Sequence, residues 1–134
     1  MTSKEERVNE ALSCHKAGYN CAQSVLMAVY DKLGATREQV AAMSAGFGGG
    51  VGGQGEICGV CSALAIAEGL LNPVDPKLKP QIYRGVRELC ARFKERNNGM
   101  IRCRDLKQPP QPRSCDTLIA DGVKILCDYL DSRS

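Results

Sequence analysis

Three capping boxes, each placed just ahead of an apolar stripe at helical spacing, constrain the fold of this chain more than any other feature. In a capping box, the side chain at the helix start accepts a hydrogen bond from the backbone three positions later, where a Glu or Gln side chain bonds back. The pairs are Ser3 with Glu6, Asn20 with Gln23, and Thr36 with Gln39. Because apolar residues recur at helical spacing almost throughout the chain and no strand pattern competes, the sequence predicts an all-α fold.

About six helices account for the pattern. The second capped helix is predicted to run to Gly34. A fourth helix over 57–71 is apolar nearly all round, so we expect it to be the buried central helix. The fifth helix follows a cap at Asp75 and runs to about Asn97, and the last helix begins at Ser114.

The length of 134 residues fits a single compact helical domain over 1–134, with one core built from the apolar stripes. The residues expected to face inward are Val8, Ala11, Leu12, His15, Ala22, Leu26, Val29, Leu33, Val40, Met43, Ser44, Ile82, Val86, Leu89, Cys90, Phe93, Leu118, Ile119, Val123, Leu126, Cys127 and Leu130.

A glycine-rich stretch over 46–55, in which seven of ten residues are glycine, lies before the predicted central helix. Such a composition opens backbone conformations that other residues avoid, so this stretch is predicted to be a loop. It lacks the Gly-Lys-Ser/Thr ending of a nucleotide-binding loop and follows a helix rather than a strand. Phosphate binding is therefore the weaker interpretation of this loop.

Charge and composition exclude several classes of function. The net charge of +3 comes from 18 basic and 15 acidic residues spread along the chain, which does not suit nucleic-acid binding. Aromatic residues make up only 4% of the chain, so stacking platforms for bases are scarce. We expect no membrane span, since no window approaches about 18 consecutive apolar residues, and the N-terminus has no apolar run of signal-peptide type. A cytoplasmic location is the expectation.

Eight cysteines, several times ordinary usage, need an explanation, and their positions divide them into two kinds. Cys90 and Cys127 lie within apolar stripes and Cys14 lies near the end of the first helix, so packing is the favoured role for these three. The other kind is expected at helix starts or in loops, where backbone amides and the helix dipole favour a thiolate. These candidates are Cys21, Cys58, Cys103 and Cys115, with Arg102, Arg104 and Arg113 expected to assist the last two.

Cys58 is the strongest of these candidates, because the glycine-rich loop leads into its helix and is expected to bring backbone amides around the sulfur. It also forms a Cys58-Gly-Val-Cys61 motif, whose two thiols share a helix face. A thioredoxin-like motif needs a βαβ setting, which this helical pattern lacks, and a zinc ribbon needs a second close pair. Glu56 would oppose a thiolate at Cys58, and Glu68 is expected to face a basic partner from one of the last two helices.

Four cysteine blocks, taken with their flanking residues, resemble a known family of redox-active proteins that is named for its C_GCAxxG_C_C motif. The matching segments are Gly18-Tyr-Asn-Cys21-Ala-Gln, Gly46-Phe-Gly-Gly-Gly, Gly55-Glu-Ile-Cys58-Gly, Phe93-Lys-Glu-Arg96, Ile101-Arg-Cys103-Arg-Asp-Leu106 and Cys115. The chain departs from the motif where it reads Cys58-Gly-Val-Cys-Ser-Ala63, which adds Cys61. The resemblance implies a redox role for Cys21, Cys58, Cys103 and Cys115, and in some relatives it implies an iron–sulfur protein.

Three hypotheses follow. In the first, the chain is a thiol-dependent oxidoreductase in which Cys58 attacks as a thiolate and Cys21, Cys61, Cys103 or Cys115 resolves the mixed disulfide. In the second, Cys21, Cys58, Cys103 and Cys115 hold an iron–sulfur cluster in an electron-transfer or sensor module. In the third, the same four thiols bind structural zinc.

The expected partner is a redox partner protein or a small-molecule thiol or disulfide. An exposed apolar stripe on the helices would suit a homodimer, although no heptad pattern specifies one.

Overall fold

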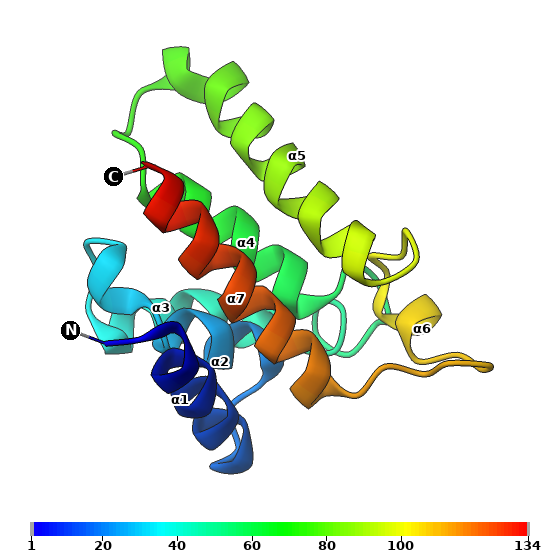
Figure 1. Cartoon of the computed structure of the whole chain (residues 1–134). Coiled ribbons are helices and arrows are strands. Elements are labelled where there is room, and N and C mark those ends of the chain that lie inside the picture. The colour runs from blue at the N-terminus through cyan, green and yellow to red at the C-terminus, as the bar shows by residue number, and fades with distance from the viewer. Residues whose placement is uncertain (1, 134) are drawn as a thin grey trace.

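All three capping boxes form in the computed structural model, which describes residues 2–133 (Figure 1). Ser3, Asn20 and Thr36 each accept a hydrogen bond from the backbone three positions on, and the Glu or Gln at that position bonds back. The three helices that follow are α1 (Lys4–Lys16), α2 (Cys21–Met27) and α3 (Arg37–Ser44). Local sequence signals therefore set these helix starts.

The predicted central helix is α4 (Gly59–Leu70), which packs against α2 and against two long helices, α5 (Lys79–Arg96) and α7 (Cys115–Arg133). Seven of its twelve residues are buried. Helix α7 also packs against α1 and α2. Helices α4 and α7 therefore link the N-terminal helices α1 and α2 to α5 (Figure 1). The all-α fold and the buried central helix are confirmed.

The described residues contain seven α-helices, one more than the six expected. The addition is α6 (Cys103–Leu106), a single turn that is too short to show a helical period. Three 3₁₀ segments complete the structure: η1 (Tyr30–Lys32), η2 (Ala45–Phe47) and η3 (Pro76–Leu78).

Three local expectations were wrong. Asp75 caps η3 instead of the fifth helix, and α5 itself begins at Lys79 without a side-chain cap. Helix α2 ends at Met27 instead of running to Gly34, and η1 continues the chain, yet Val29 and Leu33 are still buried. Met43 is 42% exposed, because α3 packs mainly against α2 and its narrow contact face consists of Val40 and Ser44.

An isolated antiparallel bridge between Ile57 and Arg102 joins the segment before α4 to the segment before α6. The Cys58 amide donates to the Ile101 carbonyl at 2.8 Å, and the Cys103 amide donates to the Glu56 carbonyl at 2.6 Å. These bonds hold the starts of two helices side by side.

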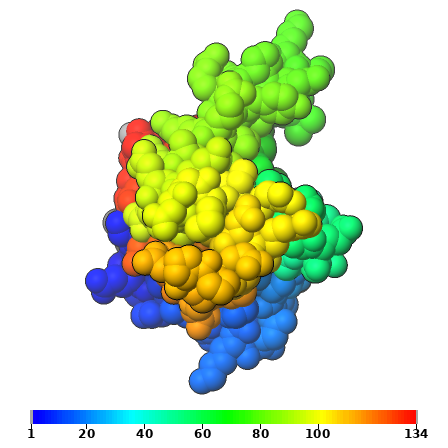
Figure 2. Space-filling view, turned by 90° about the vertical axis from the view of Figure 1, so that its right-hand side faces the viewer, coloured from blue at the N-terminus to red at the C-terminus, as the bar shows by residue number. Residues whose placement is uncertain are grey.

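The N-terminal part of α5 extends beyond the rest of the molecule, and the segment from α5 to α7 lies at the centre of the face shown in Figure 2. None of the helices in the described part of the chain has the length and apolar character that crossing a membrane requires.

Candidate functional site

Each of the four cysteines predicted at helix starts does begin a helix. Cys21 is the first residue of α2, Cys103 of α6 and Cys115 of α7, while Cys58 is the cap residue of α4. The start of α7 is stabilised by Ser114, whose hydroxyl accepts from the Thr117 amide at 3.1 Å. Each of the four sulfurs is thus positioned by the N-terminus of a different helix.

Cys21 is the member of this cluster that interacts with the other three. A β-carbon at Gly59, the residue after Cys58, would lie only 2.5 Å from Cys21 Sγ, so the start of α4 is packed against this sulfur. Negative charge on Cys115 or Cys103 raises the pKa of Cys21, and charge on Cys21 raises the pKa of Cys58, each in addition to the larger effect of burial. We call Cys21, Cys58, Cys103 and Cys115 the motif cluster.

The glycine-rich loop serves Cys21 rather than Cys58, contrary to expectation. Burial raises the pKa of Cys21, and a hydrogen bond from the Gly49 amide to its sulfur partly opposes that effect. The loop folds back on itself, and the Glu56 amide donates to the Gly50 carbonyl at 3.0 Å. Gly50 has a φ of 76°, and a β-carbon there would lie 2.5 Å from the Glu56 nitrogen, so this close approach requires glycine.

Cys58 does not have the low pKa that the sequence analysis expected. Its side chain is 3% exposed, and burial raises the pKa of Cys58 to about 12 even though the Val60 and Cys61 amides bond to the sulfur. The loss of hydration outweighs the helix-start amides because a thiolate is strongly destabilised away from water. Cys58 is therefore not poised to attack first.

Cys115 is the motif thiol with a cationic partner. The Lys107 ammonium donates to Cys115 Sγ at 3.1 Å and to the Arg113 carbonyl at 2.9 Å. Cys115 is also only partly buried, and Cys103 shares this intermediate exposure. Reactive cysteines occupy such electropositive, partly exposed surroundings. Sequence reasoning missed Lys107, because it lies in the loop eight positions before its partner and no local pattern joins the two.

The arginines expected to assist Cys103 and Cys115 have other partners. Arg104 donates to the Gln54 and Gly55 carbonyls and lies 2.6 Å from the Glu56 carboxylate. Arg102 also pairs with Glu56, at 3.4 Å. These contacts pin the glycine-rich loop to α6, and they engage the Glu56 charge that was expected to oppose a thiolate at Cys58.

Arg113 is likewise engaged elsewhere. Its guanidinium pairs with Asp121 of α7 at 3.2 Å. The expectation that Arg113 assists Cys115 is therefore replaced by the contact from Lys107.

The described residues do not fit a preformed metal centre. Across 2–133, no three His, Cys, Asp or Glu side chains converge in an arrangement that holds a metal ion. A structural zinc ion needs about four such ligands around one point, and the described thiols of the motif cluster do not form that arrangement.

The largest interaction of Cys61 is with Cys90, but Cys61 also lies next to the motif cluster, because negative charge on Cys58 raises the pKa of Cys61. Its thiol interacts as a hydrogen-bonded pair with that of Cys90 on α5. Cys61 was a predicted resolving thiol, and Cys90 was interpreted as packing, so the sequence did not anticipate this pairing.

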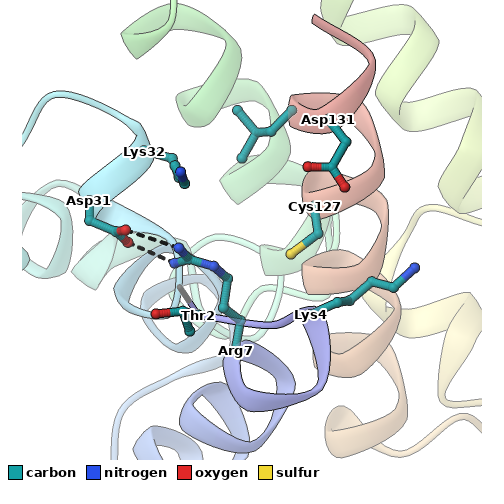
Figure 3. Close-up of a pocket in the computed structure, with 8 residues that line it drawn as sticks. Thr2, Lys4, Arg7, Asp31, Lys32, Cys127 and Asp131 are labelled. Atoms are coloured by element: carbon teal, nitrogen blue, oxygen red, sulfur yellow. Dashed lines mark hydrogen bonds and ion pairs between the residues drawn. The ribbon is translucent and has the colours of Figure 1, made fainter. Parts of the chain in front are cut away.

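Cys14 and Cys127 are buried in the core, as expected for packing cysteines. Cys127 also lines a hollow between α1, η1 and α7, shown in Figure 3, where Arg7 forms two hydrogen bonds to Asp31, at 2.7 and 2.9 Å. Burial raises the pKa of Cys127. None of the motif thiols lines this hollow, so we treat it as separate from the candidate site.

Glu68 has the basic partner that the sequence analysis expected. It is 2% exposed, accepts from the Tyr129 hydroxyl at 2.8 Å and lies 3.7 Å from Arg133 of α7. These contacts indicate that Glu68 has a structural role in the packing of α4 against α7.

Comparison with protein families gives a match to this chain. Residues 19–129 match the model of a family described as "Putative redox-active protein (C_GCAxxG_C_C)". Searches of curated proteins and of solved structures found no match to the chain. The family match covers most of the chain and all four cysteines of the motif cluster. The chain therefore belongs to the C_GCAxxG_C_C family of redox-active proteins.

Proposed function

We propose that the chain is a thiol–disulfide redox protein in which Cys115 attacks a disulfide and Cys21 resolves the product. The observation that carries this proposal is the Lys107 ammonium, 3.1 Å from the sulfur of the partly exposed Cys115. Among the motif thiols, only Cys115 has such a contact in the described part of the chain. The substrate is a disulfide on a redox partner protein or a small molecule, in a cytoplasmic setting.

In the first step, the Cys115 thiol loses its proton to solvent, and its sulfur attacks one sulfur of the substrate disulfide. A Cys115–substrate disulfide forms, the substrate S–S bond breaks and the other substrate sulfur leaves as a thiolate. In the second step, the Cys21 thiol loses its proton to solvent, attacks Cys115 Sγ and expels the second substrate thiolate. Two protein thiols are oxidised to one disulfide, and the substrate takes up two electrons.

The surroundings of Cys21 support its role as the resolving thiol. It is 9% exposed, which keeps it from external disulfides, and its charge interacts with that of Cys115. The Gly49 amide favours negative charge on its sulfur. Cys58 and Cys103 interact with Cys21 as well and form the remainder of the motif cluster.

The test follows the two thiols in the full chain after oxidation with oxidised glutathione. Trypsin releases Cys21 in the peptide 17–32 and Cys115 in the peptide 114–124, each with no other cysteine. We expect these two peptides to be joined by a disulfide in the oxidised protein. In Cys21→Ser, a glutathione adduct should accumulate on Cys115, whereas Cys127→Ser, a matched change of a core cysteine, should behave as wild type.

The same preparations decide between this chemistry and a cluster. Protein purified without oxygen is assayed for iron and acid-labile sulfide per chain. Stoichiometric iron and sulfide, lost in Cys21→Ser and retained in Cys127→Ser, would overturn the proposal. A glutathione adduct that forms on Cys58 before Cys115 would also overturn it.

A further inference from the structure

A second pair of thiols lies outside the motif cluster, between α4 and α5. Cys61 on α4 and Cys90 on α5 are both free thiols, and their side chains interact as a hydrogen-bonded pair. Neither residue belongs to the four-cysteine motif through which the chain resembles its family. The pair is therefore unexplained by the proposed function.

The packing of the two helices holds this pair in place. Helix α5 runs back along α4 in the opposite direction (Figure 1), and a β-carbon at Gly85 would collide with the Glu68 carboxylate. Cys61 lies seven positions before Glu68 on α4, and Cys90 lies five positions after Gly85 on α5. Because the two helices are antiparallel, these offsets of about two turns and about one and a half turns point in the same direction along the helix pair, so both cysteines lie at a similar height. The helix register thus independently brings the two thiols opposite each other.

The two thiols differ in access to solvent and in charge. Cys61 is 1% exposed, whereas Cys90 is only partly buried. The hydrogen bond from Cys61 lowers the pKa of Cys90, burial opposes this, and the Lys94 charge on the next turn of α5 adds to it. The same bond, together with burial, raises the pKa of Cys61. An external oxidant therefore reacts first with Cys90, which is the more accessible thiol, and the buried Cys61 can then react with Cys90.

We infer that Cys61 and Cys90 are a second redox pair, which closes to a reversible disulfide between α4 and α5 on reaction with a small-molecule disulfide. Cys90 loses its proton to solvent and attacks one sulfur of the small-molecule disulfide, so that a mixed disulfide forms, the small-molecule S–S bond breaks and one thiolate leaves. Cys61 then loses its proton, attacks Cys90 Sγ and expels the second thiolate, and the two released thiolates take up the two protons. Two protein thiols are oxidised, and one small-molecule disulfide is reduced to two thiols.

Closure of this pair would tie α5 to the central helix. The N-terminal part of α5 extends beyond the rest of the molecule (Figure 2), and α5 otherwise meets only α4, α7 and η3 in extended contact within the described residues. A covalent link at Cys90 would restrict any movement of α5 relative to α4. Oxidation of the pair would thus attach α5 covalently to α4, and reduction would release it.

Peptide mapping of the full chain tests this inference without relying on a variant. The protein is incubated with oxidised glutathione, free thiols are blocked with N-ethylmaleimide, and trypsin is added. Cys90 is released in the peptide 88–92, while Cys58 and Cys61 share the peptide 38–77, so fragmentation must assign the bridge to one of them. We expect 38–77 to be joined to 88–92 through Cys61, and the bridge to disappear on treatment with a reductant.

Two variants separate the entry thiol from the resolving thiol. Cys61→Ser should retain one glutathione on Cys90, whereas Cys90→Ser should leave Cys61 reduced; Cys14→Ser, another core cysteine, should form the bridge as wild type does. The inference is overturned if Cys90 stays fully reactive toward N-ethylmaleimide after oxidation, or if its bridge runs to Cys58. The peptides 17–32 and 114–124 report the motif cluster separately, so either proposal can fail alone.

Discussion

The four motif cysteines and the four cysteines within helices are held in different ways. The motif thiols Cys21 and Cys58, at helix starts, receive hydrogen bonds from backbone amides. Cys14, inside α1, has side-chain partners instead: it lies 3.6 Å from a Glu10 carboxylate oxygen and 3.4 Å from an Arg37 nitrogen. Cys61 and Cys90 have each other.

This difference shows that position along a helix decides which partners a thiol can have. The first backbone amides of a helix have no partner within it, so a sulfur at the start can accept from them. Inside a helix those amides are already bonded, and a sulfur depends on what the neighbouring helix presents. The thiols of the motif cluster are therefore positioned by helix N-termini and loops, whereas Cys61 and Cys90 are brought together by the packing of two helices.

The largest expected effect concerns the pair inside the helices. In a Cys21→Ser background, which removes the central motif thiol, the Cys61–Cys90 bridge should raise the free energy of unfolding by about 3–4 kcal/mol, since it closes a loop of roughly 30 residues in the unfolded chain. Urea denaturation of the oxidised and reduced forms measures the difference. The gain should vanish in Cys21→Ser/Cys90→Ser. An equal gain there would mean that the bridge lies among motif cysteines, and the comparison would break.

A smaller effect is expected from crowding the motif cluster. Gly59→Ala should cost about 1–3 kcal/mol of unfolding free energy, because its β-carbon would lie 2.5 Å from Cys21 Sγ and 2.9 Å from the Phe47 carbonyl oxygen. Gly69→Ala, in the same helix with no atom within 4 Å of the added carbon, should instead stabilise by about 0.5–1 kcal/mol. Thermal or urea unfolding of both variants is the measurement. Equal effects at the two sites would mean that the start of α4 does not press on Cys21.

The burial of Cys58 should make the stability of the protein depend on pH in the alkaline range. Burial raises the pKa of Cys58 from 9.0 to about 12, so the folded chain keeps a proton that the unfolded chain loses above pH 9. This contribution to stability is present below pH 9 and is lost as the pH rises toward 12, with a slope of up to about 1.4 kcal/mol per pH unit. Unfolding free energies of wild type and Cys58→Ser between pH 8 and roughly 11 should show a shallower decline in the variant. Parallel curves would contradict a buried neutral thiol at Cys58.

The smallest expected effect lies at the exposed edge of the motif cluster. Lys107→Gln removes the positive charge 3.1 Å from Cys115 Sγ. Alkylation of Cys115 at pH 7 should slow by about two- to fivefold, equivalent to roughly 0.4–1 kcal/mol for an exposed charge contact, and the effect should shrink at high salt. Iodoacetamide labelling of the peptide 114–124 follows the rate, and Lys32→Gln, an exposed lysine in η1 whose loss leaves this peptide intact, is the control. If both variants slow equally, the lysine contact does not distinguish Cys115 from other thiols.

Much of the architecture could be predicted because its determinants are local. Ser3, Asn20 and Thr36 each start a helix through residues only three positions away, so a short stretch contains the whole signal. The same applies to the placement of the candidate cysteines at helix starts. The single turn α6 escaped prediction because four residues carry no measurable period.

The chemistry of the cysteines was harder to predict, since it depends on contacts between distant segments. Cys58 looked like a helix-start thiolate, but burial under the packed helices raises its pKa. The glycine-rich loop bonds to Cys21, which precedes it by more than 20 positions, instead of to the Cys58 that follows it. Neither outcome can be obtained from sequence spacing.

The sequence by itself determined that this chain is helical, where most of its helices begin and which four thiols stand at those starts. These properties arise from hydrogen bonds and apolar spacing within a few residues of one another. Only the tertiary structure decided that Cys115 receives Lys107, that Cys58 is buried and that Cys61 meets Cys90. Exposure, charge contacts and thiol pairing depend on which helices pack together, and that information is distributed over the whole core.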